Sequence, residues 1–194
     1  MNSVTGIVLA GGQGRRMGGV DKGLQPFRGR PMVAHAIERL EPQVDELLIN
    51  ANRNTDDYGR FGHRVIADEI AGFAGPLAGF ERGLTHAAGA LVATVPCDSP
   101  FLPRDLVARL HAALVGAKAE LAVARTGTQA HPVFCLMRRE VLPSLREFLG
   151  AGERKIDRWY ARLAVVEVPF DDEPDAFRNI NTREELASLE PPER

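Results

Sequence analysis

The sequence predicts a single α/β domain of three layers, in which helices cover both faces of a mostly parallel β-sheet. Three observations support this prediction. The chain has 194 residues, a length that suits one domain. Short β-branched or apolar runs alternate along it with segments whose apolar residues recur every three or four positions. Strands that alternate with helices are typical of right-handed crossovers, and such crossovers build a parallel sheet.

The individual elements follow from these patterns in chain order. Seven apolar runs bounded by turn-forming residues are predicted strands: 5–10, 46–50, 64–67, 90–96, 121–125, 132–137 and 163–168. Five segments with helical spacing are predicted helices: 30–40, 76–88, 103–115, 141–149 and 155–163. A last helix is predicted from Thr182, which starts a capping box, and the tail from Glu190 is expected to fray because it contains two prolines.

The composition excludes several classes of protein. With 44% hydrophobic residues and a net charge of -2, the chain is typical of globular proteins and lacks the excess of positive charge that nucleic-acid binding usually requires. No run approaches the roughly 18 apolar residues of a membrane span, and the first ten residues do not resemble a signal peptide. Cys97 and Cys135 fit no ligand spacing and are predicted to be reduced. We therefore expect a cytoplasmic protein that binds neither nucleic acid nor membranes.

The most informative stretch follows the first predicted strand. It reads LAGGQGRRMGGVDKG over residues 9–23 and holds six glycines. Glycine lets the backbone approach a ligand and turn its N–H groups toward phosphate oxygens. Arg15, Arg16 and Lys22 add three positive charges, which suit the roughly four negative charges of a nucleoside triphosphate better than a single phosphate. The alternative is a flexible surface loop with solvated charges, although loops of this length are commonly functional.

Two familiar phosphate-binding loops do not match this stretch. The dinucleotide fingerprint G-x-G-x-x-G requires glycine where Met17 stands, and it requires an acid near the end of the second strand, where Asn50 stands. The P-loop requires G-K-[ST], whereas Lys22 follows Asp21 and precedes Gly23. These mismatches argue against an NAD-dependent oxidoreductase.

The stretch resembles the signature of the molybdenum cofactor guanylyltransferases, which belong to the nucleotidyltransferases with a Rossmann-like α/β fold. The resemblance covers almost the whole chain, through the segments INANR (49–53), VIAD (65–68), GPLAG (75–79), PCDSP (96–100), HP (131–132), GERK (152–155) and NINT (179–182). It implies transfer of GMP from GTP to the terminal phosphate of molybdopterin or Mo-molybdopterin, with release of pyrophosphate and with Mg²⁺ as cofactor. Molybdopterin-delivery proteins and molybdoenzyme chaperones are the further partners it implies.

By this resemblance, residues 1–98 mainly bind GTP. Lys22 and Arg16 are the expected catalytic cations on the phosphates. Asp98 is expected to be catalytic and to bind Mg²⁺, because this ion typically takes one or two carboxylates together with phosphates and water. The other residues expected to contact GTP are Leu9, Ala10, Gly11, Gly12, Asn50 and Asp68. The alternatives are a helix N-cap for Asp98 and a solvated turn residue for Asp68.

Residues 99–194 are expected mainly to bind the pterin. Asn179 and Asn181 alternate across one residue, so in an extended segment both amides face the same side and suit the donor and acceptor edge of a pterin. A cap for the final helix is the competing interpretation of Asn181. Lys155 stands where relatives commonly carry arginine, and it keeps the charge without the bidentate geometry. The full set expected to contact molybdopterin is Gly19, Arg154, Lys155, Asn179 and Asn181.

Other functions share part of this pattern. A cytidylyltransferase acting on the same pterin, or a sugar-phosphate nucleotidyltransferase, would carry a similar loop. The segment GGVDK at 18–22 and the N-x-N-T ending at 179–182 favour the guanylyl branch. A non-catalytic partner that only binds nucleotide would not need both Lys22 and Asp98.

Overall fold

The computed structural model describes residues 3–12, 20–69 and 75–180. Its main sheet has seven strands: β1 (Val4–Leu9), β4 (Glu46–Asn50), β5 (Arg64–Ile66), β6 (Leu91–Pro96), β7 (Leu121–Thr126), β8 (Gln129–Arg138) and β9 (Val165–Pro169). A small hairpin consists of β2 (Pro26–Phe27) and β3 (Arg30–Pro31). The helices are α1 (Met32–Leu40), α2 (Thr55–Gly59), α3 (Pro76–His86), α4 (Leu106–Gly116), α5 (Leu142–Gly150) and α6 (Ile156–Tyr160), with 3₁₀ turns η2 (Glu41–Gln43) and η3 (Arg139–Val141).

The main sheet is mostly parallel, as predicted. Its order is β5-β4-β1-β6-β8-β7-β9. Parallel pairs join β1 to β4 and β6, β4 to β5, and β7 to β9, whereas β8 runs antiparallel to β6 and β7. The antiparallel pair β7–β8 follows from the chain itself, because Gly127 turns at φ +54 between the two strands and leaves no room for a crossover helix.

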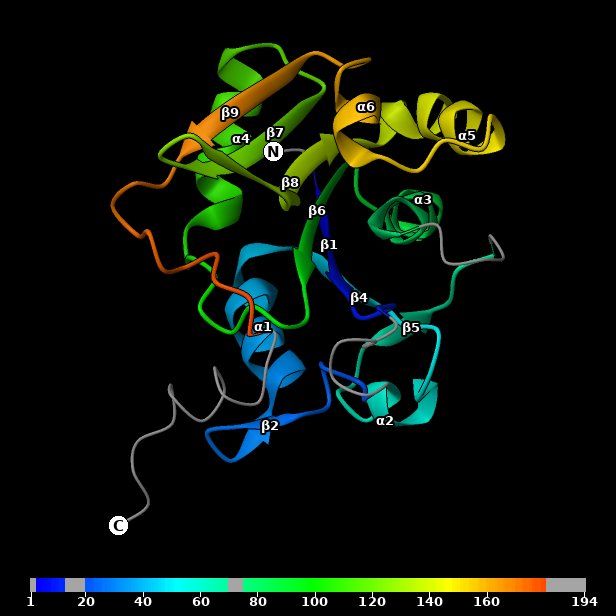
Figure 1. The fold of residues 1–194 in the computed structure, drawn as a ribbon, viewed down its shortest axis with the longest axis vertical. Helices are drawn as coiled ribbons and strands as arrows, with labels where there is room; N and C mark the ends of the chain where they lie inside the picture. Colours follow the sequence, from blue (N-terminus) through cyan, green and yellow to red (C-terminus); the bar gives the residue numbers. More distant parts are fainter. Residues whose placement is uncertain (1–2, 13–19, 70–74, 181–194) are drawn as a thin grey trace.

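Alternate residues of each strand face opposite sides of the sheet, which produces three layers (Figure 1). Val8 and Val95 pack in one cluster with the buried faces of α1 and α4. Ile7 and Val92 pack in a second cluster with α3, α5 and α6. The three-layer prediction is therefore confirmed. The longest helices in the described part, α3 and α4, have 11 residues, and no helix described there has the length and apolar character that a bilayer crossing requires.

All seven predicted strands and all five helices predicted within the described ranges are present, with shifted ends. The helix predicted over 30–40 begins at Met32, since Arg30 and Pro31 form β3. The helix predicted from 103 begins three residues later, at Leu106. The last helix, predicted from Thr182, lies outside the described residues, as does the tail.

Two short elements were not expected from the sequence. The hairpin β2–β3 has only two residues in each strand, and α2 has five residues with one buried side chain, Tyr58. Neither is long enough to show a period of two or of 3.6. The helix α2 nevertheless matters for the site, because Tyr58 donates a hydrogen bond to Asp21, the neighbour of Lys22.

The strand order places the ends of four strands at one edge. Since β1, β4, β5 and β6 are parallel, the segments that follow them meet at their carboxyl ends. The connection after β1 leads to β4 on one side, and the connection after β6 leads to β7 and β8 on the other. Open α/β sheets bind ligands where the connections diverge in this way. The expected position of a binding site is therefore at the carboxyl ends of β1 and β6.

Candidate functional site

Lys22 and Asp98 meet at this edge, although 76 positions separate them in the sequence. Lys22 Nζ lies 3.4 Å from Asp98 Oδ2, and the two side chains are 20% and 13% exposed. Burial raises the pKa of Asp98 above its ordinary value, and the nearby Lys22 ammonium offsets only part of this effect. The backbone of Asp98 is held from the other side, where its carbonyl accepts a hydrogen bond of 3.0 Å from Ile180 N. The site thus contains a desolvated carboxylate beside a cation.

Replacing Asp98 by asparagine is expected to leave the fold as stable as the natural chain, or more stable, at neutral pH. Because the folded state raises the pKa of Asp98, the folded chain holds that proton more tightly than the unfolded chain. The contribution of this group to the free energy of unfolding therefore falls as pH rises through the ordinary value of 3.8 toward the raised one. Urea unfolding at pH 7 and at about pH 4 measures the difference between the two proteins, which should shrink in acid.

Asp172→Asn provides the matched control, with the opposite sign. Arg109 donates hydrogen bonds to Asp172 and lowers the pKa of its carboxyl, so charge at this position favours the folded state and the benefit is lost on acidification. The pair is exposed, so its effect is expected to be small. A lower unfolding midpoint for Asp98→Asn at pH 7 would contradict the prediction and mean that the Lys22 contact outweighs burial.

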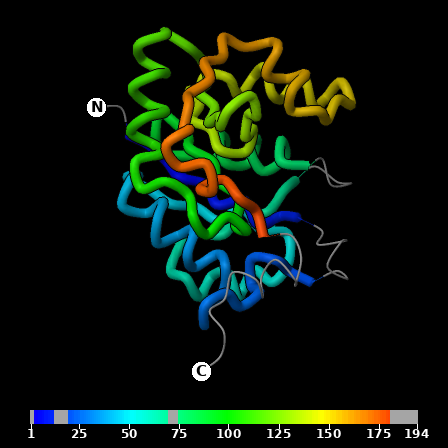
Figure 2. The backbone as a smooth tube through the Cα atoms, turned by 60° about the vertical axis from the view of Figure 1, so that its left-hand side comes forward, coloured from blue at the N-terminus to red at the C-terminus, as the bar shows by residue number. Residues whose placement is uncertain are grey.

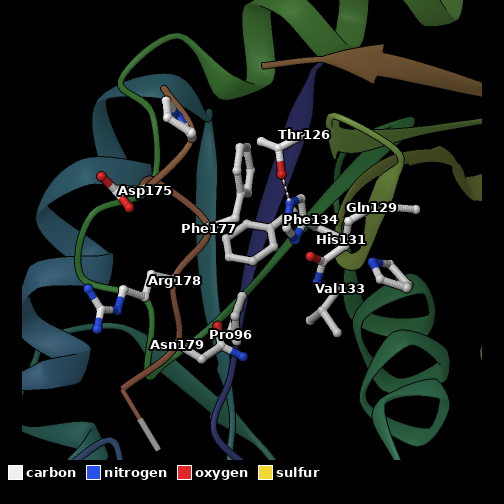
Figure 3. A pocket seen from close by; sticks show the side chains of 13 residues that line it. Pro96, Thr126, Gln129, His131, Val133, Phe134, Asp175, Phe177, Arg178 and Asn179 are labelled. Carbon is white, nitrogen blue, oxygen red and sulfur yellow. Dashed lines mark hydrogen bonds between the residues drawn. The ribbon is translucent and has the colours of Figure 1, made fainter. Parts of the chain in front are cut away.

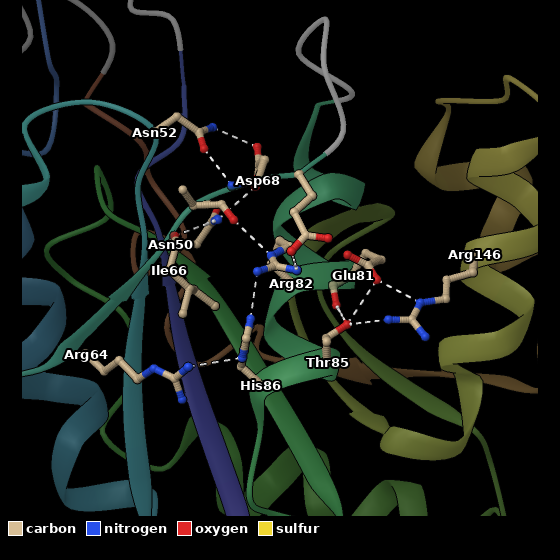
Figure 4. A network of polar contacts seen from close by, with 12 residues as sticks. Asn50, Asn52, Arg64, Ile66, Asp68, Glu81, Arg82, Thr85, His86 and Arg146 are labelled. Atoms are coloured by element: carbon tan, nitrogen blue, oxygen red, sulfur yellow. Dashed lines mark hydrogen bonds and ion pairs between the residues drawn. The ribbon is translucent and has the colours of Figure 1, made fainter.

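Asn50 and Asn52 orient Asp68 at the ends of β4 and β5 (Figure 4). Asn50 Nδ2 donates to Asp68 Oδ1 at 2.9 Å and to Ile66 O at 3.3 Å. Asn52 Nδ2 donates to Asp68 Oδ2 at 2.7 Å, and Asp68 N donates to Asn52 Oδ1 at 2.8 Å. Each carboxylate oxygen therefore accepts one amide hydrogen and retains lone-pair capacity for a ligand.

Two glycines allow the backbone to approach this cluster closely. A Cβ at Gly11 would lie 2.9 Å from Asn52 Nδ2, and a Cβ at Gly79, in α3, would lie 2.6 Å from Asn50 Oδ1. Asn50 is only 2% exposed, so its amide acts inside the protein. The glycines at these positions of the sequence therefore serve close packing around the two asparagines, and Asp68 is the more accessible polar group.

The chain before Gly11 continues the sheet. Ala10 N donates to Asn50 O at 2.7 Å, and Leu9 O accepts from Cys97 N at 3.0 Å. Leu9 and Ala10, both predicted to contact GTP, thus use these two backbone groups to bind neighbouring strand ends. Gly12 O accepts from Arg53 Nη2 at 3.1 Å. The loop leaves the sheet at Gly11 and Gly12, which places its start over the Asn50–Asp68 cluster.

A cavity of about 520 Å³ opens next to the end of β6 (Figure 3). Its walls come from β8, from the 174–179 segment and from Pro96. Asn179 lines it and accepts a hydrogen bond of 2.5 Å from Ser99 Oγ. In Figure 2 the orange-to-red segment that ends at Ile180 runs beside the green segment after β6, in agreement with the hydrogen bond from Ile180 N to Asp98 O. Two hydrogen bonds therefore connect the cavity wall to the segment of Asp98, one from Ser99 to Asn179 and one from Ile180 to Asp98.

One wall of the cavity is aromatic. His131 stacks on Phe177 with ring centroids 4.5 Å apart and 11° between the planes, and its Nε2 lies 2.7 Å from Thr126 Oγ1. Burial lowers the pKa of His131, so its ring is neutral at physiological pH. An uncharged aromatic wall of this kind is well suited to a flat heterocycle.

The remaining predicted site residues divide into two groups. Arg154 and Lys155 are exposed at the junction of α5 and α6, where Arg154 donates to the carbonyls of Leu149 and Glu153. The structure does not show them in contact with Asp98 or Asn179. Arg15, Arg16, Gly19 and Asn181 lie outside the described residues. Within residues 3–12, 20–69 and 75–180 no group of three or more His, Cys, Asp or Glu side chains could hold a metal ion.

Two residues of the site were missed by the sequence reasoning. Asn52 could have been found, because Asn50 and Asn52 alternate at a strand end in the same way as the asparagines at 179 and 181. Tyr58 gave no signal, since it is the one buried residue of a helix too short to show a period. Its contacts are long-range, with Asp21 37 positions away.

Known proteins resemble this chain along most of its length. The family model described as MobA-like NTP transferase domain matches residues 6–166. A molybdenum cofactor guanylyltransferase of Shewanella halifaxensis is 50% identical over 186 residues, which are 96% of this chain and 93% of that relative. A protein of the same name from Burkholderia ambifaria is 50% identical over 196 residues, with coverage of 96% and 95%.

Solved structures share the fold. The molybdopterin-guanine dinucleotide biosynthesis protein A from Archaeoglobus fulgidus has a TM-score of 0.80 at 24% identity, over 95% of this chain and 96% of that one. The 4-diphosphocytidyl-2C-methyl-D-erythritol synthase from Anaerococcus prevotii has a TM-score of 0.74 at 13% identity, over 96% and 94%. The nucleotidyltransferase fold predicted from the sequence is confirmed.

Proposed function

The chain belongs to the MobA-like NTP transferase family and is a nucleotidyltransferase, and from this premise we propose that it transfers GMP from GTP to the terminal phosphate of molybdopterin. Pyrophosphate is the leaving group, and the acceptor phosphate displaces it in line at the α-phosphorus. Residues 1–98 bind mainly GTP in this proposal, and residues 99–194 bind mainly the acceptor. The observation that carries it is the Lys22–Asp98 pair at the carboxyl edge, with a cavity beside it.

The chemistry demands positioning more than proton transfer. A phosphate monoester has a second pKa of about 6, so the acceptor phosphate is mostly dianionic at neutral pH and needs no general base. The barrier is electrostatic, because one anion must approach another. Groups that hold both phosphates and offset their charge therefore supply most of the rate.

Lys22 lies at the end of the glycine-rich loop, and its ammonium is proposed to bind the phosphates of GTP. Asp98, buried and next to this cation, fits Mg²⁺ binding, since one or two carboxylates with substrate phosphates complete the shell that this ion prefers. When bound, Mg²⁺ would offset charge on the α-phosphate. Burial keeps the Asp98 carboxylate poorly solvated, so the carboxylate gains more from a cation there than an exposed one would. Arg16 keeps its proposed catalytic role on the phosphates.

Asp68 is proposed to recognise the guanine. Its two oxygens are fixed by Asn50 and Asn52, and a guanine offers the N1–H and N2–H₂ donors that such a carboxylate accepts. Gly11 lies against the same cluster, and the backbone groups of Gly11 and Gly12 are proposed to complete the base and ribose contacts. Cytosine lacks this pair of adjacent donors, which gives the site a physical basis for preferring GTP.

The acceptor is proposed to enter the cavity lined by Asn179 and His131. The aromatic wall suits the pterin, and the carboxamide of Asn179 suits its polar edge. The hydrogen bond between Ile180 N and Asp98 O then sets the distance between the acceptor and the reacting phosphate. Contacts of the acceptor with Gly19, Arg154, Lys155 and Asn181 stay predictions from the resemblance.

Asn179→Ala is expected to raise KM for molybdopterin about tenfold and to leave KM for GTP within about twofold, as the loss of one or two hydrogen bonds predicts. It should also lower the unfolding midpoint, because the buried hydroxyl of Ser99 loses its acceptor. Steady-state kinetics with each substrate varied in turn, together with urea unfolding, measure both effects.

Asn179→Asp serves as the control that separates the two effects. It keeps an oxygen for Ser99, so stability should return, but it loses the amide donor and adds a negative charge near an anionic acceptor, so KM for molybdopterin should stay high. If Asn179→Ala leaves both KM values unchanged, the acceptor does not occupy this cavity.

Pyrophosphate release tests the function as a whole. The chain incubated with GTP, molybdopterin and Mg²⁺ should release pyrophosphate, and omission of molybdopterin should abolish the release. CTP in excess should compete poorly. Release with CTP at the same rate would point to a cytidylyltransferase, and no release with either nucleotide would contradict the proposal. Delivery proteins, molybdoenzyme chaperones and a cytoplasmic location stay predictions, the last consistent with two free cysteines.

A further inference from the structure

The segment that follows β4 holds both described ends of the glycine-rich loop. At the start of the loop, Arg53 Nη2 donates to Gly12 O at 3.1 Å. At its end, Asp21 accepts two hydrogen bonds: Asn54 Nδ2 donates to Oδ2 at 3.0 Å, and Tyr58 Oη donates to Oδ1 at 2.5 Å. Asn54 adopts the left-handed conformation at φ +49, which starts α2 at this point. One short segment therefore fixes where the loop leaves and rejoins the fold.

Tyr58 contacts the chain on both sides of Lys22. Its hydroxyl binds Asp21, the preceding residue, and it also lies so close to Gly23, the following residue, that a Cβ there would be 2.5 Å from Oη. Gly23 O accepts a further hydrogen bond of 2.9 Å from Val33 N, in α1. The backbone of Lys22 is thus held by both neighbours, and its side chain extends to Asp98.

The environment of Tyr58 keeps its hydroxyl a hydrogen-bond donor. The side chain is fully buried, and burial, followed by the neighbouring Cys97 and Asp21, raises its pKa well above the ordinary value. A neutral phenol donates to a carboxylate, and such charge-assisted hydrogen bonds are short and strong. Asp21, the acid adjacent to Lys22, thus accepts hydrogen bonds from Tyr58 and Asn54, while Lys22 reaches Asp98.

We propose that Tyr58 is a positioning residue of the transferase: through Asp21 and Gly23 it fixes the backbone of Lys22, so that the ammonium is directed at Asp98 and the phosphates. This inference rests on the proposed function for its kinetic consequences. It assigns a separate task to each residue of the Asp21-Lys22-Gly23 segment. Asp21 anchors, Lys22 carries the charge, and Gly23 permits the close approach to the hydroxyl.

Tyr58→Phe removes only the hydroxyl and is expected to lower kcat about tenfold, because Lys22 is then less well placed for the transition state. The decisive readout is a double-mutant cycle with Lys22→Ala. If Tyr58 acts through Lys22, Tyr58→Phe should reduce kcat by less than twofold when Lys22 is already alanine. If the role of Tyr58 is merely structural, the reductions in kcat of the two single variants should multiply in the double variant.

Thr5→Val is the matched control. Its hydroxyl is also fully buried and also donates to a carboxylate, Glu46 Oε2 at 2.6 Å, but it lies in the amino-terminal half of β1. Thr5 Oγ1 also accepts a hydrogen bond of 3.0 Å from Gly89 N, so Thr5→Val should lower the urea midpoint at least as much as Tyr58→Phe. Only Tyr58→Phe should change kcat. Equal effects on kcat would overturn the proposal.

A second measurement does not depend on activity. Acetic anhydride acylates exposed amines, and peptide mass spectrometry gives the rate at Lys22. This rate should rise severalfold in Tyr58→Phe and stay unchanged in Thr5→Val, since only the former releases Lys22 from its position beside Asp98. If the natural chain releases no pyrophosphate but the acylation rate rises as expected, the transferase assignment is wrong and the positioning stands. If acylation is unchanged, or pyrophosphate release is undiminished in Tyr58→Phe, the positioning is wrong.

Discussion

Asp98→Ala is expected to lower kcat about a thousandfold. The variant removes the carboxylate at the end of β6 that pairs with Lys22. In the proposed mechanism Asp98 holds the Mg²⁺ that would offset charge on the α-phosphate, and loss of one such electrostatic contribution typically costs about 3–4 kcal/mol of transition-state stabilisation. GTP binding measured by calorimetry without divalent ions should change less than threefold, because the proposed base contacts at Asp68 remain.

Asp45→Ala is the control for this experiment. Asp45 is also an aspartate with a backbone partner, since its Oδ2 accepts from Val4 N at 2.8 Å, but it directly precedes β4 and lies beside the amino end of β1. It should lower stability and leave kcat unchanged. Activity of Asp98→Ala near that of the natural chain would remove both the metal role and the catalytic role from this residue.

Lys22→Ala is expected to weaken GTP binding about tenfold and to lower kcat about a hundredfold. An ammonium beside a triphosphate contributes to ground-state binding, and it contributes more when charge shifts toward the leaving pyrophosphate. The same variant leaves the desolvated Asp98 without its counter-charge, so the pKa of that carboxyl should rise further. The activity profile should accordingly shift its acidic limb to higher pH.

Lys118→Ala removes the same charge from an exposed position after α4 and is expected to affect neither binding nor turnover. Isothermal titration with GTP and kinetics over a range of pH separate the two effects of Lys22. Unchanged GTP affinity in Lys22→Ala would show that the triphosphate does not lie along this loop, even if turnover falls.

The pattern of residues along the chain was sufficient to predict the strands of the main sheet and the helices that cover it. Strand residues such as Ile7 and Val8 alternate between two faces, and helix residues such as Val33 and Ile37 recur on one face. Each strand or helix can therefore be predicted from residues close together in the sequence. The elements that escaped, β2, β3 and α2, are too short to carry a period. At the glycine-rich loop, the positive charges and the glycines were the basis for predicting an anion site.

The sequence by itself determined the fold class, and it predicted a phosphate-binding loop and individual roles for Lys22 and Asp98. Only the tertiary structure decided that these two residues pair, that Asn52 completes the hold on Asp68, and that Tyr58 anchors Asp21. The reason is physical. A periodic pattern reflects neighbours within one element, whereas each of these contacts joins segments whose proximity depends on strand order and on the close packing that glycines at 11, 23 and 79 permit.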